Sequence, residues 1–259
     1  MLKKRLIFNL LHSNGYFMLS RNFTLQQVGD INWLRDHYKF WESSKFLDEI
    51  IILDVSRGDS HLSNFISIVQ NVIKSSFIPI SVGGGIKKLE DVDLLIRSGA
   101  DKVVINSLFY SNPNEIIKIT SKYGIQSVIA SIDYKYNKNS DEVYVNNGSK
   151  KIEINLEDYI KRVIEIGAGE ILLNSMAQDG TGQGFDLDVR NRIGDIKDTP
   201  LIISGGAGRV DHFAEALSQE YDAASTANLF NFIGDGLKRS REDLTQKKID
   251  IPIFERLRS

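Results

Sequence analysis

Eight short apolar segments recur along this chain of 259 residues, separated by stretches of helix length. Continuous apolar runs flanked by amphipathic helices are typical of parallel strands buried on both faces. Eight strand–helix units in a chain of this length fit a closed (β/α)8 barrel better than a doubly wound sheet. We therefore predict an α/β fold, a (β/α)8 TIM barrel forming a single domain over residues 1–259. The predicted strands are 5–11, 49–55, 78–84, 102–107, 127–133, 170–176, 200–206 and 223–229.

An internal repeat supports the barrel. Residues 79–109 align without gaps with residues 200–230, which indicates two half-barrels related by a twofold axis. The identical pairs are Pro79/Pro200, Gly84/Gly205, Gly85/Gly206, Asp101/Asp222, Leu108/Leu229 and Phe109/Phe230. Between the fifth strand and the next helix, residues 134–156 alternate in polarity around Asn147-Gly148, a pair typical of hairpin turns. We predict an inserted hairpin there.

Composition narrows the functional classes. The chain has no Cys, which excludes disulfides, thiolate metal sites and Cys nucleophiles. Its net charge is −2 with both signs interspersed, so nothing indicates a nucleic-acid or membrane surface. The N-terminal MLKKRLIFNLL is superficially similar to a signal peptide, but Asn9 interrupts it and no small-residue cleavage site follows. We expect a soluble cytoplasmic protein with no metal and no cofactor.

Two Gly-rich segments follow predicted strands at positions related by the repeat: VGGGI (82–86) and SGGAG (204–208). Glycines let backbone N–H groups approach an anion closely, and a following helix N-terminus favours negative charge. Tight turns that need positive φ would explain one such segment, but the duplicated placement favours phosphate binding. We predict a long ligand with a phosphate at each end. The candidate contacts are Gly84, Gly85, Asn106, Ser107, Gly206 and Asn228.

Three acids fall at the carboxyl ends of the strands, where such barrels carry their active sites: Asp54, Asp133 and Asp179. Asp133 ends an otherwise apolar strand, so burial should tune its pKa and it can serve as a general acid/base. Its structural alternative is to cap the loop or to pair with Lys135. Asp179 is predicted to organise its loop near the second phosphate. For Asp54 the sequence leaves both a catalytic and a structural role open.

Charged residues also begin several strands, at the opposite end of the barrel. Strand periodicity puts Lys102 on the same face as Asn106, Glu170 on the same face as Asn174, and Arg5 in phase with Asn9. Glu49 opens the second strand. Inward charges need partners, so the residues alone favour a salt-bridge plug on the barrel floor over a gate to an axial passage.

Three segments resemble the cyclase subunit of imidazole glycerol phosphate synthase, the HisF family. They are VGGGIKKLEDVDLLIRSGADKVVINS, GAGEILLNSMAQDGTGQGFDLD and SGGAGRVDHFAEAL. The resemblance runs nearly end to end, and GAGEILLNSM with DGT separates it from the sister isomerases. It implies a barrel that receives ammonia from a HisH-like glutaminase docked on its floor. It also implies a charged gate, a bisphosphorylated ribulose-type substrate, and ring closure by two aspartates.

Carried over by position, the resemblance assigns Arg5, Glu49, Lys102 and Glu170 to the gate, which reverses the preference for a plug. It assigns Gly85, Asn106, Asp179, Gly180 and Gly206 to phosphate contacts, and Asp133 to the fifth-strand catalytic aspartate.

Several positions depart from the family pattern. Leu11 replaces the first-strand catalytic aspartate, and Leu19 replaces the lysine of the mobile loop that follows, HSNGYFMLSRNF. Asn174 replaces a threonine and Asn228 a phosphate-binding serine. Leu cannot transfer a proton, so the two-aspartate mechanism cannot operate unchanged. His12 is adjacent, but it should point away from the face that carries Leu11.

The retained gate and the lost acid together resemble divergent HisF-like proteins associated with acetamidino modification of surface-glycan sugars. The leading hypothesis is an ammonia-dependent lyase- or cyclase-type subunit of a glutamine amidotransferase that supplies ammonia for amidation of a sugar, together with a separate sugar amidotransferase. One alternative is a genuine cyclase of histidine biosynthesis. The other is a non-catalytic conduit or scaffold for ammonia.

Overall fold

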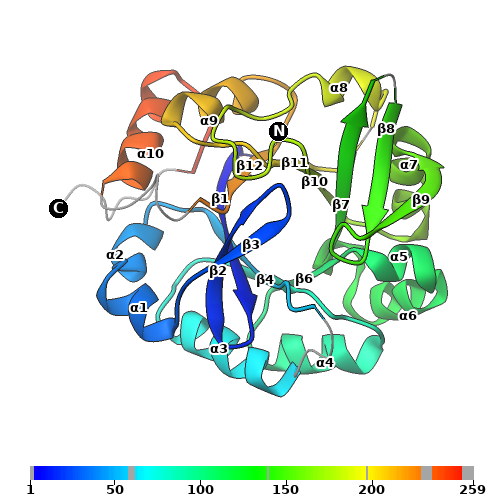
Figure 1. Ribbon diagram of the computed structural model, residues 1–259, viewed down its shortest axis with the longest axis horizontal. Coiled ribbons are helices and arrows are strands. Elements are labelled where there is room, and N and C mark those ends of the chain that lie inside the picture. Colours follow the sequence, from blue (N-terminus) through cyan, green and yellow to red (C-terminus); the bar gives the residue numbers. More distant parts are fainter. Residues whose placement is uncertain (1–2, 58–61, 139, 197, 229–234, 253–259) are drawn as a thin grey trace.

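Eight parallel strands close into a barrel with helices around it (Figure 1). The computed structural model describes residues 3–57, 62–138, 140–196, 198–228 and 235–252. Each barrel strand pairs with the next, and the last pairs back to the first, which confirms the predicted (β/α)8 barrel. In spatial order the strands are β1 (Arg5–Ser13), β4 (Glu49–Asp54), β5 (Ile80–Gly83), β6 (Lys102–Ile105), β7 (Val128–Asn137), β10 (Glu170–Ser175), β11 (Leu201–Ser204) and β12 (Ala223–Thr226).

Helices cover the outside of the barrel with their apolar faces. Helix α7 illustrates how these helices begin and end. At its start the Asn155 side chain accepts a hydrogen bond from the Asp158 N–H, and Gly167 at φ +126° ends it. Among the described residues, no helix is long and apolar enough to cross a membrane. The longer helices are α3 (Leu62–Lys74), α4 (Leu89–Arg97), α6 (Pro113–Tyr123), α7 (Leu156–Ile166), α9 (Val210–Leu217) and α10 (Gly236–Gln246). The shorter ones are α1 (Ile31–Asp36), α2 (Phe40–Ser44), α5 (Ser107–Ser111), α8 (Val189–Arg192) and the 3-10 turn η1 (Ile125–Ser127).

Two antiparallel additions extend the barrel strands over its mouth. The segment after β1, treated above as a loop, is a hairpin of β2 (Tyr16–Arg21) and β3 (Thr24–Gly29), and it lies over the centre of the barrel in Figure 1. After β7 the chain forms β8 (Ser140–Val145) and β9 (Lys150–Asn155), which turn at residues 146–149. Strand β7 itself continues past the barrel and pairs with β8. The insertion is therefore a three-stranded flap.

The internal repeat has a direct structural counterpart at the barrel floor. The Asp101 carboxylate accepts the Ile80 N–H at 2.8 Å, and the Asp222 carboxylate accepts the Leu201 N–H at 2.9 Å. Each aspartate thus fixes the first amide of the preceding strand. Of the repeat pairs, Leu229 and Phe230 lie outside the described residues.

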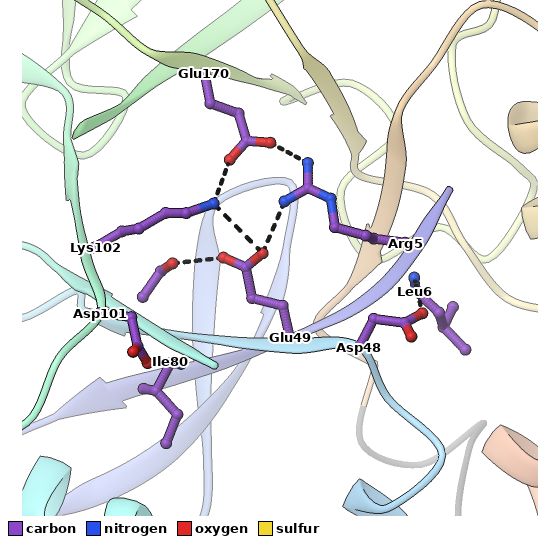
Figure 2. A network of polar contacts seen from close by, with 9 residues as sticks. Arg5, Leu6, Asp48, Glu49, Ile80, Asp101, Lys102 and Glu170 are labelled. Atoms are coloured by element: carbon purple, nitrogen blue, oxygen red, sulfur yellow. Dashed lines mark hydrogen bonds and ion pairs between the residues drawn. The ribbon is translucent and has the colours of Figure 1, made fainter. Parts of the chain in front are cut away.

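One buried ion pair ties the last long helix to the barrel. The Arg241 guanidinium, on α10, donates to both carboxylate oxygens of Asp48 at 2.9 and 3.1 Å. Their side chains are 5% and 3% exposed. Asp48 also accepts the Leu6 N–H at 2.8 Å (Figure 2), so the pair connects α10 with β1 and the entry to β4.

Replacing Arg241 should therefore destabilise the fold. We expect Arg241→Met to lower the free energy of unfolding by about 3–5 kcal/mol, because Asp48 would stay buried without its cation. Lys238→Met on the same helix is the matched control: its ion pair with Glu242 is half exposed, so the change should stay within about 0.5 kcal/mol. Denaturant unfolding measures both, and equal losses would contradict the assignment.

Candidate functional site

A cavity of about 1810 Å³ opens at the carboxyl ends of the barrel strands. Its floor and walls come from the barrel, and the β2–β3 hairpin and the β8–β9 turn contribute its rim. It brings together every predicted mouth residue. These are Asn9, Leu11, Asp54, Gly84, Gly85, Asn106, Ser107, Asp133, Asn174, Asp179, Gly180, Gly206 and Asn228.

Asp133 is the one of these acids whose environment suits proton transfer at neutral pH. Asn174 Nδ2 donates to one carboxylate oxygen at 2.9 Å, and Asn106 Nδ2 donates to the other at 3.2 Å. Burial raises the pKa of Asp133 to about 7; the Asn174 hydrogen bond opposes this shift and the charge of Asp179 adds to it. Lys135 lies at an exposed position on β7, and no cation pairs with Asp133 within the described ranges.

Leu11 and His12 point to opposite sides of β1. Leu11 lines the mouth and is 9% exposed, so the cavity wall at this point is apolar. His12 packs outside the barrel against Phe65, with ring centroids 5.4 Å apart, and its Nε2 accepts the Gly15 N–H at 3.1 Å. Burial lowers the pKa of His12. The histidine therefore does not substitute for the missing acid in the mouth.

The two Gly-rich turns both have positive φ at corresponding glycines. Gly84 and Gly205 have φ of +94° and +90°, and Gly85 and Gly206 have φ of +70° and +107°. A side chain at Gly84 would collide with the Asp54 carbonyl, so close packing contributes to the need for glycine there. Phosphate binding at these turns stays a prediction.

The other two mouth acids organise the rim. Asp179 accepts hydrogen bonds from Ser20 Oγ at 2.5 Å and from the Phe23 N–H at 2.9 Å, which fastens the β2–β3 hairpin. Asp54 accepts both the Ser56 N–H at 3.0 Å and Ser56 Oγ at 2.5 Å. Asp179 thus makes loop contacts of the kind predicted for it, and Asp54 holds its own loop while it also lines the cavity.

At the opposite end, the four predicted floor residues form one connected ion network (Figure 2). Arg5 bonds Glu49 at 2.9 Å and also Glu170. Lys102 lies 3.0 Å from Glu170 and 3.9 Å from Glu49. The two glutamates are only 3% and 6% exposed, whereas Arg5 and Lys102 are 21% and 27% exposed. Ser81 Oγ donates to Glu49 at 2.5 Å, a partner that sequence reasoning missed although Ser81 follows the inward phase of its strand.

Between floor and mouth, the barrel axis changes from apolar to polar. A layer of aliphatic side chains that includes Ile7, Ile51 and Ile129 packs in the interior. Nearer the mouth, Asn9 Nδ2 lies 3.2 Å from Ser225 Oγ and 3.4 Å from Ser204 Oγ. Asn9 Oδ1 is buried and has no hydrogen-bond partner among the described residues. Asn9 thus provides a polar group partway along the barrel axis, in phase with Arg5 as expected. Sequence reasoning missed the two serines, although their inward phase signals them.

The burial of Asp133 generates a pH-dependent stability. Its folded-state pKa of about 7 lies above the usual 3.8, so the folded protein keeps its proton longer, and stability is lost as pH rises between these values. Asn mimics the neutral acid. We expect Asp133→Asn to gain on the order of 2–4 kcal/mol relative to the parent chain between pH 5 and pH 8, measured by urea unfolding.

Asp36→Asn is the control of opposite sign, because the hydrogen bond from Arg35 lowers the pKa of that exposed carboxyl. Its difference from the parent chain should move against the variant only as pH rises toward the usual value of 3.8, and it should stay constant between pH 5 and pH 8. A pH-independent difference for Asp133→Asn would contradict the burial argument.

Comparison with known proteins places this geometry in a family. The family described as "Histidine biosynthesis protein" matches residues 32–234. A protein of Parasynechococcus marenigrum (strain WH8102), provisionally designated imidazole glycerol phosphate synthase subunit hisF2, is 45% identical over 93% of this chain and 90% of its own length. Imidazole glycerol phosphate synthase subunits HisF of Pyrobaculum aerophilum and Flavobacterium johnsoniae are 39% and 36% identical, over 88% and 97% of this chain and 89% and 99% of their own. The chain therefore belongs to the HisF family, the cyclase subunits of imidazole glycerol phosphate synthase.

Proposed function

We propose that this HisF-type subunit takes ammonia from a HisH-like glutaminase and delivers it through the barrel to a phosphorylated acceptor in the mouth. This proposal rests on a contrast between the two ends of the barrel. The four-residue floor network is complete, whereas Leu11 leaves the mouth with a single acid, Asp133, in a proton-transfer environment.

The floor has the character of a docking face. Phe77, in the loop that enters β5, is fully exposed, and Ile125, at the entry to β7, is 56% exposed. A partner that covers these side chains would remove apolar area from water, and aromatic residues are enriched in interface cores. These loops border the strand ends that carry Lys102 and Glu170, so a glutaminase seated there would release ammonia at the ion network.

The axis suits a small neutral molecule. Ammonia is uncharged, so the aliphatic layer above the floor does not exclude it, whereas an ammonium ion would meet a large desolvation penalty there. Asn9 Oδ1 is buried with no partner in the described part of the chain, and it can accept a hydrogen bond from an N–H of the passing molecule.

The mouth suits one addition step assisted by one carboxyl group. As ammonia attacks the carbon of an acceptor that already carries an activated oxygen leaving group, the C–N bond forms and the C–O bond breaks. Asp133 can accept the proton that the nitrogen loses and pass it to the departing oxygen. The family's ring closure employs two aspartates, and Leu11 supplies no second one. Within this proposal the reaction is amidation, such as acetamidino formation on a surface-glycan sugar, with a separate sugar amidotransferase as a further partner.

Family membership favours the rival function, the cyclase of histidine biosynthesis. The proposal predicts that the parent chain turns over the family's bisphosphate substrate with ammonium salts roughly 10² to 10⁴ times more slowly than the Flavobacterium johnsoniae relative. It also predicts that Leu11→Asp raises this rate, because the substitution places a carboxyl group on β1, at the position of the family's first catalytic aspartate.

Leu53→Asp is the matched control, because Leu53 pairs with Leu11 in the neighbouring strand and lines the same cavity. It should leave the rate unchanged. A parent rate equal to that of the relative would contradict the proposal and support the cyclase.

The second rival function is a non-catalytic conduit for ammonia. It is distinguished from the proposal by comparing glutamine with external ammonium as the source of nitrogen. In cells that carry only the variant gene, Lys102→Gln should reduce glutamine-dependent glycan amidation, and high external ammonium should restore it. Asp133→Asn should reduce amidation by roughly 10²-fold or more with either source, because the acid/base group itself is lost.

Mass spectrometry of the glycan measures both effects. Lys118→Gln, which removes an exposed cation from α6, should match the parent. Full amidation by Asp133→Asn would instead establish the conduit.

A further inference from the structure

A second cavity of about 480 Å³ lies beside the mouth, between α5, the β8–β9 turn and α7. We call it the lateral pocket. In Figure 1 these elements lie next to one another at the edge of the barrel. The polar and aromatic residues lining it are Ser107, Tyr110, Ser111, Asn146, Lys150 and Arg162. Its volume falls within the range typical of small-molecule sites.

The lateral pocket carries two positive charges without a compensating acid. No Asp or Glu is among the described residues that line it, and neither Lys150 nor Arg162 makes an ion pair within the described ranges. Lys150 Nζ lies 5.5 Å from the centre of the Tyr110 ring, which holds the ammonium at the cavity wall. Both cations line the same cavity, so an anion seated in it would be attracted by both.

The lateral pocket also shares a wall with the mouth. Ser107, Ser111 and Asn146 line both cavities, and the Asn146 N–H donates to Ser107 Oγ at 2.9 Å between them. Ser107 Oγ in turn donates to Asn106 Oδ1 at 3.1 Å, and Asn106 hydrogen-bonds Asp133. A molecule that extends from the mouth into the lateral pocket would therefore pass directly over the side chains that hold Asp133.

We propose that the lateral pocket binds a phosphate group carried by the acceptor molecule, outside the two Gly-rich turns. The Arg162 guanidinium, the Lys150 ammonium and the Ser111 hydroxyl form a donor set suited to phosphate, whereas the Ser107 hydroxyl already donates to Asn106. The assignment to the acceptor rests on the proposed function, whereas the anion site itself rests only on the pocket. The acceptor would then be longer than a bisphosphate spanning the mouth, as a sugar linked to a diphosphate is.

Lysine acetylation read by mass spectrometry tests this site within one chain. Inorganic pyrophosphate at ten times its Kd should slow acetylation of Lys150 roughly tenfold, because a bound anion occludes the amine. Lys151, the next residue, pairs with Glu142 and is 44% exposed, so its rate should change little. Equal protection of the two lysines, or no protection, would overturn the site.

Two variants identify the donors. Arg162→Gln should abolish the protection of Lys150, whereas Lys161→Gln, on the same helix but paired with Glu157, should preserve it. Loss of protection in both variants would indicate general charge attraction and would overturn the site.

A second probe identifies the source of the phosphate. A nucleoside diphosphate sugar should protect Lys150 at lower concentration than inorganic pyrophosphate, because its sugar also occupies the mouth. Stronger protection by inorganic pyrophosphate would overturn the assignment to the acceptor. None of these measurements requires glutaminase or turnover, so their failure is distinguishable from failure of the proposed function.

Discussion

The four charges on the barrel floor constrain the rest of the molecule. Glu49 and Glu170 are almost fully removed from water, so each depends on Arg5 and Lys102 for its compensation. The four residues come from four different strands, and the network therefore forms only when the barrel has closed in the right register. A buried ion network is often no more stable than an apolar layer of the same volume. The network is therefore weak evidence for stability, and the proposed function gives it a role at the entrance to the barrel.

At the mouth, a different constraint determines the pKa of Asp133. Two asparagine amides hold its carboxylate in place, yet they supply no positive charge, so burial dominates and the pKa rises to about 7. An arginine or lysine at either position would lower that pKa and fix the carboxylate in its charged form. The neutral partners keep both protonation states accessible near neutral pH. Asn174, which departs from the family's threonine, therefore tunes the acid that the chain retains.

The sequence predicted the barrel well because parallel strands buried on both faces leave long apolar runs. It also predicted the inward phase of Arg5, Lys102 and Glu170, since alternation along a strand fixes the face of each side chain. It missed the β2–β3 hairpin, because within β2 only Phe17 is buried and no alternating apolar pattern marks the strand. That hairpin is fastened instead by Asp179, from a loop more than 150 residues away in the chain. The amide partners of Asp133 were also missed. Contacts between strands depend on the register of the strands, which no local pattern encodes.

With only one of its acids in an environment suited to proton transfer, the mouth is limited in the reactions that it can support. With two carboxyl groups, one can stay a base while the other stays an acid, and protons can enter and leave at different points of a ring. With one, the same group must accept the proton and later return it, which is efficient only if its pKa lies near the working pH. Asp133 meets that condition, and Leu11 removes the second point of transfer. Under the proposed function the mouth would therefore support one bond-forming step at one carbon, whereas a ring closure with proton transfers on two sides would need a second such group.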